Sequence, residues 1–318
     1  MFFLELILGL VLVLWGADLL ISSAIALGKK YNLSEVFIGI IVIGFGTSLC
    51  ELFVSIDAVI KGASELSLGN IIGSNVANIL LVLGVSSFFK VYKFPKINKL
   101  DNIIHLTITI FFVGVCFFSY LTKFWGTIFI VIFLIYLSFL LKSINPQESE
   151  DNEVIEKKNW LNEKISKSPV TVGIPVIFLS FLITLQGADI TVFSAIKISE
   201  FFGISESAIG LSVTAIGTSL PEIAAGYAAI KRNKPNLVVG NIIGSNMYNI
   251  LLIIGISTFF NAFKYDLTNI SNDLLFLLFC ITVFFVMAFY RVTITKPISI
   301  ALISVYVSYM IFLYNNNF

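Results

Sequence analysis

Long apolar stretches separated by short polar stretches run through almost the whole chain. Ten of them are long enough to cross the roughly 30 Å hydrocarbon core of a bilayer, which takes about 20 helical residues. Alternation with a period of two, the mark of a membrane barrel, does not occur. The pattern therefore predicts an all-α integral membrane protein, because helices satisfy their own backbone hydrogen bonds in lipid. The predicted spans are residues 2–28, 34–60, 68–89, 102–121, 124–141, 171–199, 207–230, 237–260, 274–290 and 297–315.

The pattern repeats once at a fixed spacing. Residues 46–89, GTSLCELFVSIDAVIKGASELSLGNIIGSNVANILLVLGVSSFF, align without a gap with residues 217–260, GTSLPEIAAGYAAIKRNKPNLVVGNIIGSNMYNILLIIGISTFF. The same offset carries the Gly-Ala-Asp at 16–18 onto the Gly-Ala-Asp at 187–189. Each copy contains five predicted spans, an odd number, so the second copy crosses the membrane in the opposite direction. We therefore expect ten transmembrane helices arranged as two inverted five-helix repeats.

Composition and charge agree with this layout. Of the 318 residues, 58% are hydrophobic and 12% are charged, which is typical of membrane proteins. Sixteen of the 20 Lys and Arg residues fall in loops on one predicted side of the membrane and three on the other, with Lys197 inside the sixth span. Cytoplasmic loops carry the excess of positive charge. We therefore expect a multi-pass protein of the cell membrane with both termini outside. A net charge of +1 without a basic stripe gives no indication of nucleic-acid binding.

A polar segment separates the two halves. We expect a first half over residues 1–142, a cytoplasmic linker over 143–168 and a second half over 169–318. The linker contains ESEDNE, which is rich in oxygen donors but lacks the central Gly and the twelfth-position Glu of an EF-hand calcium loop. We interpret it as a solvated connector.

Two glutamates lie in the middle of predicted spans. Glu51 lies in the second span, and its counterpart Glu222 lies in the seventh. A carboxylate near the bilayer centre costs at least about 2.5 kcal/mol, and no Lys or Arg lies at that depth in the second, third, seventh or eighth span. The inverted repeat brings both glutamates to a common depth. Their expected partner is a mobile cation.

Hydroxyl and amide side chains accompany both glutamates. Residues three or four positions apart share a helix face, and hard cations such as Ca²⁺ bind six to eight oxygen atoms. The carbonyls of Gly44 and Ala215 are further candidates, because nearby Gly and Pro weaken the helix. No His or Cys cluster of the kind that favours zinc or copper is present. The candidate side-chain ligands are Thr47, Ser48, Glu51, Ser74 and Asn78 in the first copy and Thr218, Ser219, Glu222, Ser245 and Asn249 in the second.

Other polar and small residues have two interpretations each. The GxxxG spacings of Gly69 with Gly73 and of Gly240 with Gly244 are also typical of close helix packing, which is compatible with ion binding nearby. Asp18 in the first span and Asp189 in the sixth either pair across the bundle or line an access path, and we favour a structural role for both.

The two GTSL(C/P)E stretches and the two GNIIGSNxxN stretches resemble the α-repeats of the sodium/calcium exchanger family within the cation/calcium antiporters. By this resemblance the α-repeats cover residues 36–89 and 207–260. The resemblance implies a ten-helix antiporter with two to four ion positions between helices two, three, seven and eight. It also implies that helices one and six slide to alternate access, and that the residues matched above are the ligands.

Two positions depart from the family pattern. Cys50 stands where the motif usually has Pro, as Pro221 does in the second copy, so the first copy is expected to bend less or to rely on Gly44 and Gly46. Asn249 stands where many sodium/calcium exchangers have Asp. The two glutamates then supply a formal ligand charge that balances one Ca²⁺.

The leading functional hypothesis is a secondary active antiporter that exchanges Ca²⁺ for Na⁺ by alternating access. The alternative is exchange of Ca²⁺ or another divalent cation coupled to H⁺ or K⁺. An enzyme is not expected, because neither the GxGD nor the HExxH string of intramembrane proteases occurs. A passive channel is disfavoured, because two carboxylates closing on one site indicate occluding binding. No cofactor is expected, the partners are membrane lipid and small cations, and the transport unit is expected to be a monomer.

Overall fold

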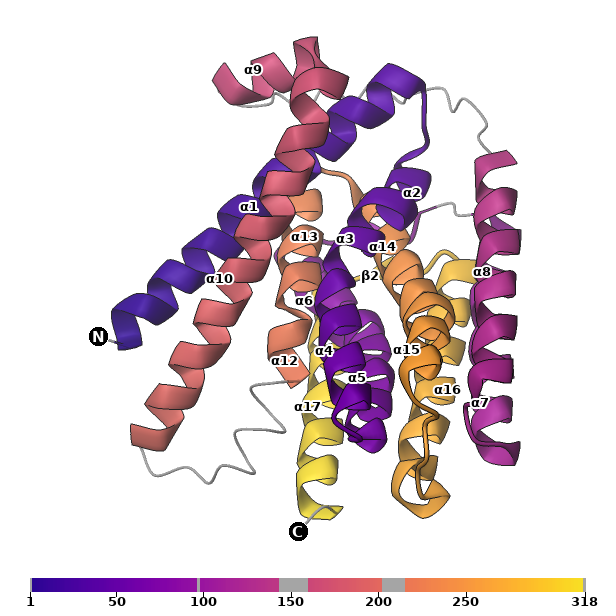
Figure 1. Ribbon diagram of the computed structural model, residues 1–318. Coiled ribbons are helices and arrows are strands. Elements are labelled where there is room, and N and C mark those ends of the chain that lie inside the picture. The colour runs from indigo at the N-terminus through magenta and orange to yellow at the C-terminus, as the bar shows by residue number, and fades with distance from the viewer. Residues whose placement is uncertain (1, 96–97, 143–159, 202–214, 317–318) are drawn as a thin grey trace.

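Helices make up nearly all of the structure, a computed structural model that describes residues 2–95, 98–142, 160–201 and 215–316 (Figure 1). Within these ranges, eight helices are long and apolar enough to cross a membrane. A ninth is added if the bent pair Glu35–Thr47 and Leu49–Ile60 counts as one span. The prediction of an all-helical membrane protein is therefore confirmed.

The elements carry the labels of Figure 1. The first half contains α1 (Phe2–Tyr31), α2 (Glu35–Ile38), η1 (Gly39–Gly44), α3 (Phe45–Thr47), α4 (Leu49–Ile60), α5 (Ser64–Ala77), η2 (Asn78–Val82), α6 (Leu83–Phe89), β1 (Tyr92–Lys93), α7 (Lys99–Phe118) and α8 (Lys123–Lys142). They are followed by α9 (Trp160–Lys167), η3 (Pro169–Gly173), α10 (Ile174–Phe201), α12 (Ala215–Thr218), α13 (Leu220–Lys231), α14 (Pro235–Met247), η5 (Tyr248–Ile253), α15 (Ile254–Phe260), α16 (Leu267–Phe289), β2 (Thr293–Ile294) and α17 (Lys296–Asn316). The η segments are π-helical turns, which are wider than α-helical turns.

The predicted spans coincide with these helices. The seventh span, 207–230, begins in residues outside the described part of the chain, and its remainder forms α12 and α13. The third begins earlier than predicted, at Ser64, and continues through η2 to Phe89. Most of the predicted linker also lies outside the described ranges, and its last residues form α9. The count of ten spans therefore stays a prediction.

The helices α1 and α10 pack side by side as a tilted pair at one edge of the bundle (Figure 1). A β-carbon added at Gly187 would lie 2.7 Å from the backbone nitrogen of Val13, and one added at Gly16 would lie 3.0 Å from the carbonyl oxygen of Ser180. Since the position along α10 falls as the position along α1 rises, the two helices run in opposite directions. Only glycine permits such close backbone approach, which drives helix association in lipid.

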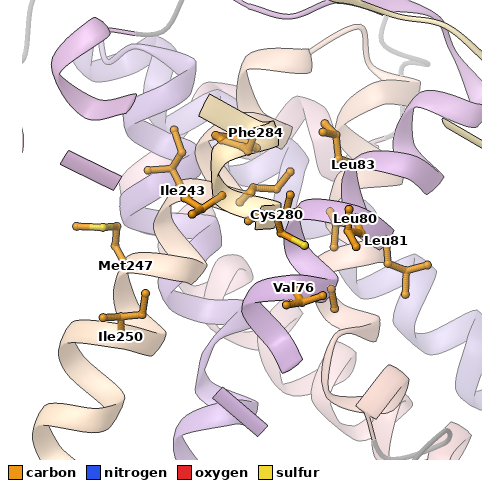
Figure 2. Close-up of a cluster of buried hydrophobic side chains, with 14 of the residues drawn as sticks. Val76, Leu80, Leu81, Leu83, Ile243, Met247, Ile250, Cys280 and Phe284 are labelled. Carbon is orange, nitrogen blue, oxygen red and sulfur yellow. The ribbon is translucent and has the colours of Figure 1, made fainter. Parts of the chain in front are cut away.

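The centre of the bundle is formed by the continuous helices Ser64–Phe89 and Pro235–Phe260. In their most apolar windows, 78% and 94% of the residues are buried, more than in the other spans of the described chain. Their apolar side chains meet α16 in one cluster, shown in Figure 2. The cluster includes Val76, Leu80, Leu81, Leu83, Ile243, Met247, Ile250, Cys280 and Phe284.

The segment α2–η1 lies directly against α14. A β-carbon at Gly39 would lie 2.8 Å from the Cα of Gly240, and one at Gly244 would lie 2.6 Å from the carbonyl oxygen of Ile40. The GxxxG spacing in the second copy thus serves close packing, one of the two roles considered. Around Gly69 and Gly73, no described atom lies within 4 Å of an added β-carbon.

Two short backbone contacts join the halves, one at each of two repeat-related residues. Strand β1, which follows α6, pairs with β2 between α16 and α17, and the Phe94 amide donates to the Val292 carbonyl at 2.9 Å. Likewise, the Phe263 amide after α15 donates to the carbonyl of Leu121, between α7 and α8, at 2.9 Å. The offset of the repeat carries Leu121 onto Val292. The two acceptors are therefore equivalent, whereas Phe94 corresponds to Tyr265 and not to Phe263, so the two pairings differ in register by two residues.

Gly244→Ala is expected to destabilise the protein, because the α2–η1 segment would have to move away from α14. Overpacking of this kind costs about 1–3 kcal/mol, so the midpoint of thermal unfolding in detergent should fall by several degrees. Gly114→Ala in α7 is the matched control, since no described atom lies within 4 Å of its added β-carbon. Equal midpoints for the two variants would contradict the packing described here.

Candidate cation site

Both copies of the repeat contain a helix break at the same serine. In the first copy, α3 ends at Thr47 and α4 begins at Leu49, with a bend of 41° around Ser48. In the second copy, Ser219 separates α12 from α13. The expectation that Cys50 leaves the first copy less bent, or reliant on Gly44 and Gly46, stays a prediction. The break lies at the serine whether Cys or Pro follows two residues later.

The two glutamates occupy the first turns of the helices that follow these breaks. Glu51 lies three residues after Ser48, and Glu222 lies three residues after Ser219, which is the capping-box spacing. The positive end of a helix dipole stabilises a carboxylate in its first turn. Each glutamate is therefore placed where a half-helix favours its ionised form.

Neither glutamate is solvated or paired within the described structure. Both side chains are 0% exposed, and their four carboxylate oxygens have no hydrogen-bond partner among the described residues. The carboxylates lie close enough to interact electrostatically. The Ser74 hydroxyl lies beside Glu51 and the Thr47 hydroxyl beside Glu222, without closing hydrogen bonds to them. Two buried carboxylates from the two halves thus interact without a described partner.

A polar network from both halves surrounds the carbonyl of Gly44. The Thr47 hydroxyl lies 3.2 Å from the Ser245 hydroxyl and donates to Oδ1 of Asn241 at 3.3 Å. The Ser245 hydroxyl also donates to the Gly44 carbonyl at 3.4 Å. The structure therefore brings Thr47, Gly44 and Ser245 together, as predicted from the sequence.

The asparagine side chains form a second connection. Nδ2 of Asn78, the first residue of η2, donates to Oδ1 of Asn246 at 3.1 Å. The bond leaves Oδ1 of Asn78 buried and without a partner among the described residues. The equivalent bond from Nδ2 of Asn249 to Oδ1 of Asn75 is not formed, and both of these atoms are buried without a partner among the described residues, while Nδ2 of Asn75 donates to the Ile71 carbonyl at 2.6 Å. The two halves are thus locally inequivalent.

The predicted side chains leave a set of buried oxygens unsatisfied. A buried polar atom without a partner costs about 1–3 kcal/mol, and a cation bound to these oxygens would offset that cost. The candidate ligand atoms are oxygens of hydroxyls, amides and carboxylates only, the type of ligand that a hard cation prefers. Across the described ranges, no group of three or more His, Cys, Asp or Glu could hold a metal. The unsatisfied oxygens belong to Ser48, Glu51, Ser74, Asn78, Ser219, Glu222 and Asn249.

Two predicted ligands of the second copy are less well defined. Thr218 is 9% exposed at the end of α12. Ala215 is the first residue of that short helix, and the role of its carbonyl stays a prediction.

Sequence reasoning missed two asparagines of the network, Asn241 and Asn246. Both belong to the GNIIGSNxxN motif, and Asn241 lies four residues before Ser245, a spacing that could have identified it. Asn246 was harder to find. The π-helical turns at η2 and η5 change which side chains share a face after Asn78 and Tyr248.

The two aspartates of the tilted pair differ in their surroundings. Asp18 of α1 forms an ion pair with Arg232 at the end of α13. This is the pairing across the bundle that we considered for it. Asp189 of α10 forms no ion pair with any described residue.

Repeat-related helices that break beside two buried carboxylates define the class of this protein, a helical membrane protein with a candidate cation site. A family model for the sodium/calcium exchanger protein matches residues 1–142 and 172–315. The chain belongs to this family, as the sequence motifs predicted.

Known proteins resemble the chain over most of its length. The putative antiporter CaxA of Alkalimonas amylolytica is 32% identical over 254 residues, 79% of this chain and 78% of that protein. The sodium/calcium exchanger MaX1 of Methanosarcina acetivorans is 31% identical over 291 residues, 81% of this chain and 83% of that protein. A structure of the sodium-calcium exchanger NCX_Mj, soaked with 2.5 mM Na⁺ and 10 mM Sr²⁺, matches with a TM-score of 0.81 at 28% identity. The match covers 96% of this chain and 98% of that chain.

Asn246→Ala is expected to weaken Ca²⁺ binding about two- to tenfold, because Asn78 would lose the bond that orients its amide, worth about 0.5–1.5 kcal/mol. Calorimetric titration of purified protein measures the change. Asn102→Ala is the control, since Asn102 is buried in α7 and donates to the Phe285 carbonyl away from the network. If both variants bind Ca²⁺ equally well, Asn246 does not orient a ligand.

Cys50 provides a chemical probe of the same region. It is partly exposed, whereas Cys116 and Cys280 are buried, and it lies close enough to both glutamates to interact with them. A small membrane-permeant thiol reagent should therefore abolish Ca²⁺ binding by the natural chain and leave Cys50→Ser unaffected. Equal sensitivity of the two proteins would place the modified thiol away from the site.

Proposed function

We propose that the chain is a secondary active antiporter that exchanges Ca²⁺ for Na⁺ by alternating access. The observation that carries this proposal is the pair of fully buried carboxylates, Glu51 and Glu222, at the breaks of two repeat-related helices. The names of the relatives support it, since MaX1 is a sodium/calcium exchanger and NCX_Mj was soaked with Na⁺ and divalent cations.

The proposed ligands are the side chains predicted from the sequence, together with the Gly44 and Ala215 carbonyls. Their only formal charges are those of Glu51 and Glu222, which balance one Ca²⁺ or two Na⁺. A third Na⁺ would leave a net positive charge in a medium of low dielectric constant, where uncompensated charge is costly. We therefore favour no more than two sodium ions together with the pair.

The proposed architecture is ten helices in two inverted halves, in which α12 and α13 belong to the seventh span. The constant offset of the repeat supports it, as do the backbone contacts that the equivalent residues Leu121 and Val292 each make with the other half. The distribution of Lys and Arg supports external termini and a cytoplasmic linker. One chain carries both halves of the site, so the proposed transport unit is a monomer surrounded by lipid. No cofactor is required, because the ions themselves are the substrates.

Exchange follows from the electrostatics of the two glutamates. Without a cation they repel each other, and neither has a cationic side chain within ion-pair distance among the described residues. Removing water from around two unpaired carboxylates is unfavourable, because their charges lose solvation and repel each other more strongly. A bound cation neutralises the pair and permits closure. The carrier therefore changes sides only when loaded, which couples the two ion fluxes.

Coupling to H⁺ or K⁺ is the alternative function. It uses the same oxygens, because a proton on one carboxylate would also remove the repulsion. Part of this chain is 33% identical over 84 residues to the human sodium/potassium/calcium exchanger 3, which makes K⁺ a counter-ion to test.

Glu51→Gln and Glu222→Gln are each expected to reduce sodium-driven uptake of radioactive calcium into proteoliposomes to background. Each variant removes half of the negative charge that binds Ca²⁺. Glu163→Gln is the matched control, since Glu163 lies in α9 and pairs with Lys167 at the surface. Full uptake by either buried variant would contradict the site.

The counter-ion is tested in the same proteoliposomes by replacing the outward Na⁺ gradient with a proton or a K⁺ gradient. We expect Ca²⁺ uptake with Na⁺ only, because the proposed charge balance accepts Na⁺. Uptake driven by protons or K⁺ without Na⁺ would instead establish the alternative function.

A further inference from the structure

Arg232 ties the end of α13 to the middle of α1. One guanidinium nitrogen donates to the Asp18 carboxylate, and the other donates to the Ser22 hydroxyl at 2.6 Å. The Ser22 hydroxyl in turn donates to the Asp18 carbonyl at 2.9 Å. The Arg232 side chain is only 12% exposed. A planar guanidinium that is held by two partners and shielded from water forms a stronger contact than an exposed ion pair.

A second ion pair lies close to Arg232 in the chain. Nζ of Lys234 lies 2.6 Å from the Glu35 carboxylate, and Nδ2 of Asn236 donates to the same carboxylate at 2.9 Å. Glu35 is the first residue of α2. The turn between α13 and α14 is thus bonded to both α1 and α2, which closes the bundle at this end.

The repeat assigns an equivalent to each member of the first ion pair. At the offset of the repeat, Arg232 corresponds to Lys61 at the end of α4, and Asp18 corresponds to Asp189 in α10. In the structure, however, Lys61 pairs with Asp57 at 2.6 Å, and both of those side chains are more than half exposed. Asp189 has no ion-pair partner among the described residues. The two halves therefore have equivalent residues at these positions but form different ion pairs.

The aspartate that has an ion-pair partner is also the less exposed of the two. Asp18 is partly buried and Asp189 is exposed. Both lie near the middle of helices long enough to span a membrane. An ionisable group at that depth faces water or a partner rather than lipid. The end of the bundle at Arg232 is therefore held by an ion pair, whereas Asp189 has no described ion-pair partner toward the end at Lys61.

We propose that Asp18–Arg232 and Asp189–Lys61 are alternative ion pairs, each of which forms when its own end of the bundle closes. This inference rests on the proposed alternating access. The glycine contacts between α1 and α10 make the two helices one unit. A shift of that unit along the membrane normal that brings Asp189 to Lys61 takes Asp18 away from Arg232, because the halves are inverted. Lys61 exchanges Asp57 for Asp189 in this step.

The two ion pairs are not equally strong. Arg232 makes two bonds through a rigid fork, whereas Lys61 is a single ammonium group on a flexible stem. Lys61 also has a competing partner, Asp57, whose equivalent in the other half is Ala228. The state with the Arg232 end closed is therefore favoured at rest. By the distribution of charged loops this end is cytoplasmic, so the resting site opens to the outside.

Cross-linking of cysteine pairs tests the proposal directly. In a chain with the three natural cysteines replaced by Ser, one protein carries Asp18→Cys with Arg232→Cys, and another carries Asp189→Cys with Lys61→Cys. With a short thiol-specific bifunctional reagent, we expect the first pair to react readily in the resting protein and the second slowly. In a chain that carries all four substitutions, prior reaction of the first pair should prevent reaction of the second. Simultaneous cross-linking of both pairs would overturn the proposal.

A charge variant provides the second measurement. Arg232→Gln should accelerate cross-linking of the Asp189→Cys and Lys61→Cys pair at least about fivefold, which corresponds to the loss of about 1 kcal/mol from the resting state. Lys264→Gln is the matched control, because Lys264 is an exposed loop lysine that does not take part in either pair. Equal acceleration by both variants, or none by Arg232→Gln, would overturn the exchange of ion pairs.

The failure of this inference is distinguishable from failure of the proposed function. Cross-linking is measured in detergent without an ion gradient, so it does not depend on which cations are exchanged. Mutually exclusive cross-links in a protein that does not exchange Ca²⁺ would support the ion-pair exchange and reject the calcium assignment. Calcium exchange with simultaneous cross-links would reject the ion-pair exchange alone.

Discussion

Two carboxylates buried next to each other in a membrane are the constraint on which the rest of this structure depends. Glu51 and Glu222 are fully buried, and no described side chain neutralises them. The interaction of two like charges is weak in water but strong in a medium of low dielectric constant. The helix breaks at Ser48 and Ser219 offset part of this cost by directing the positive ends of α4 and α13 at the carboxylates.

The breaks impose a packing requirement of their own. Non-helical backbone is tolerated at membrane depth only where protein or a water-filled cavity covers it. In the first half this cover comes from α14, whose Gly240 and Gly244 allow η1 to approach within backbone contact. The glycines and the polar residues of the GNIIGSNxxN motif therefore act together. The glycines bring the helices close enough for Thr47 to reach Asn241 and Ser245.

Sequence symmetry and contact symmetry differ in this molecule, and the difference has a physical meaning. Asn78 is anchored by Asn246, whereas Asn249 is not anchored by Asn75. Asp18 is paired, whereas Asp189 is not paired with a described residue. Two identical halves with identical contacts would be equally closed at both ends. Unequal contacts allow one end to be held closed while the other is not, as the proposed alternating access requires.

The sequence by itself determined the helices, the repeat and the chemical type of the site. Apolar length, the constant offset between the two copies and the oxygen side chains around Glu51 and Glu222 are all readable along the chain without knowledge of the packing. Only the tertiary structure decided which of these side chains meet. The bonds of Thr47 to Asn241, of Asn78 to Asn246 and of Arg232 to Asp18 join residues between 168 and 214 positions apart. Their geometry depends on helix tilt, π-helical turns and glycine contacts, and a symmetric sequence cannot specify which of two equivalent bonds is formed.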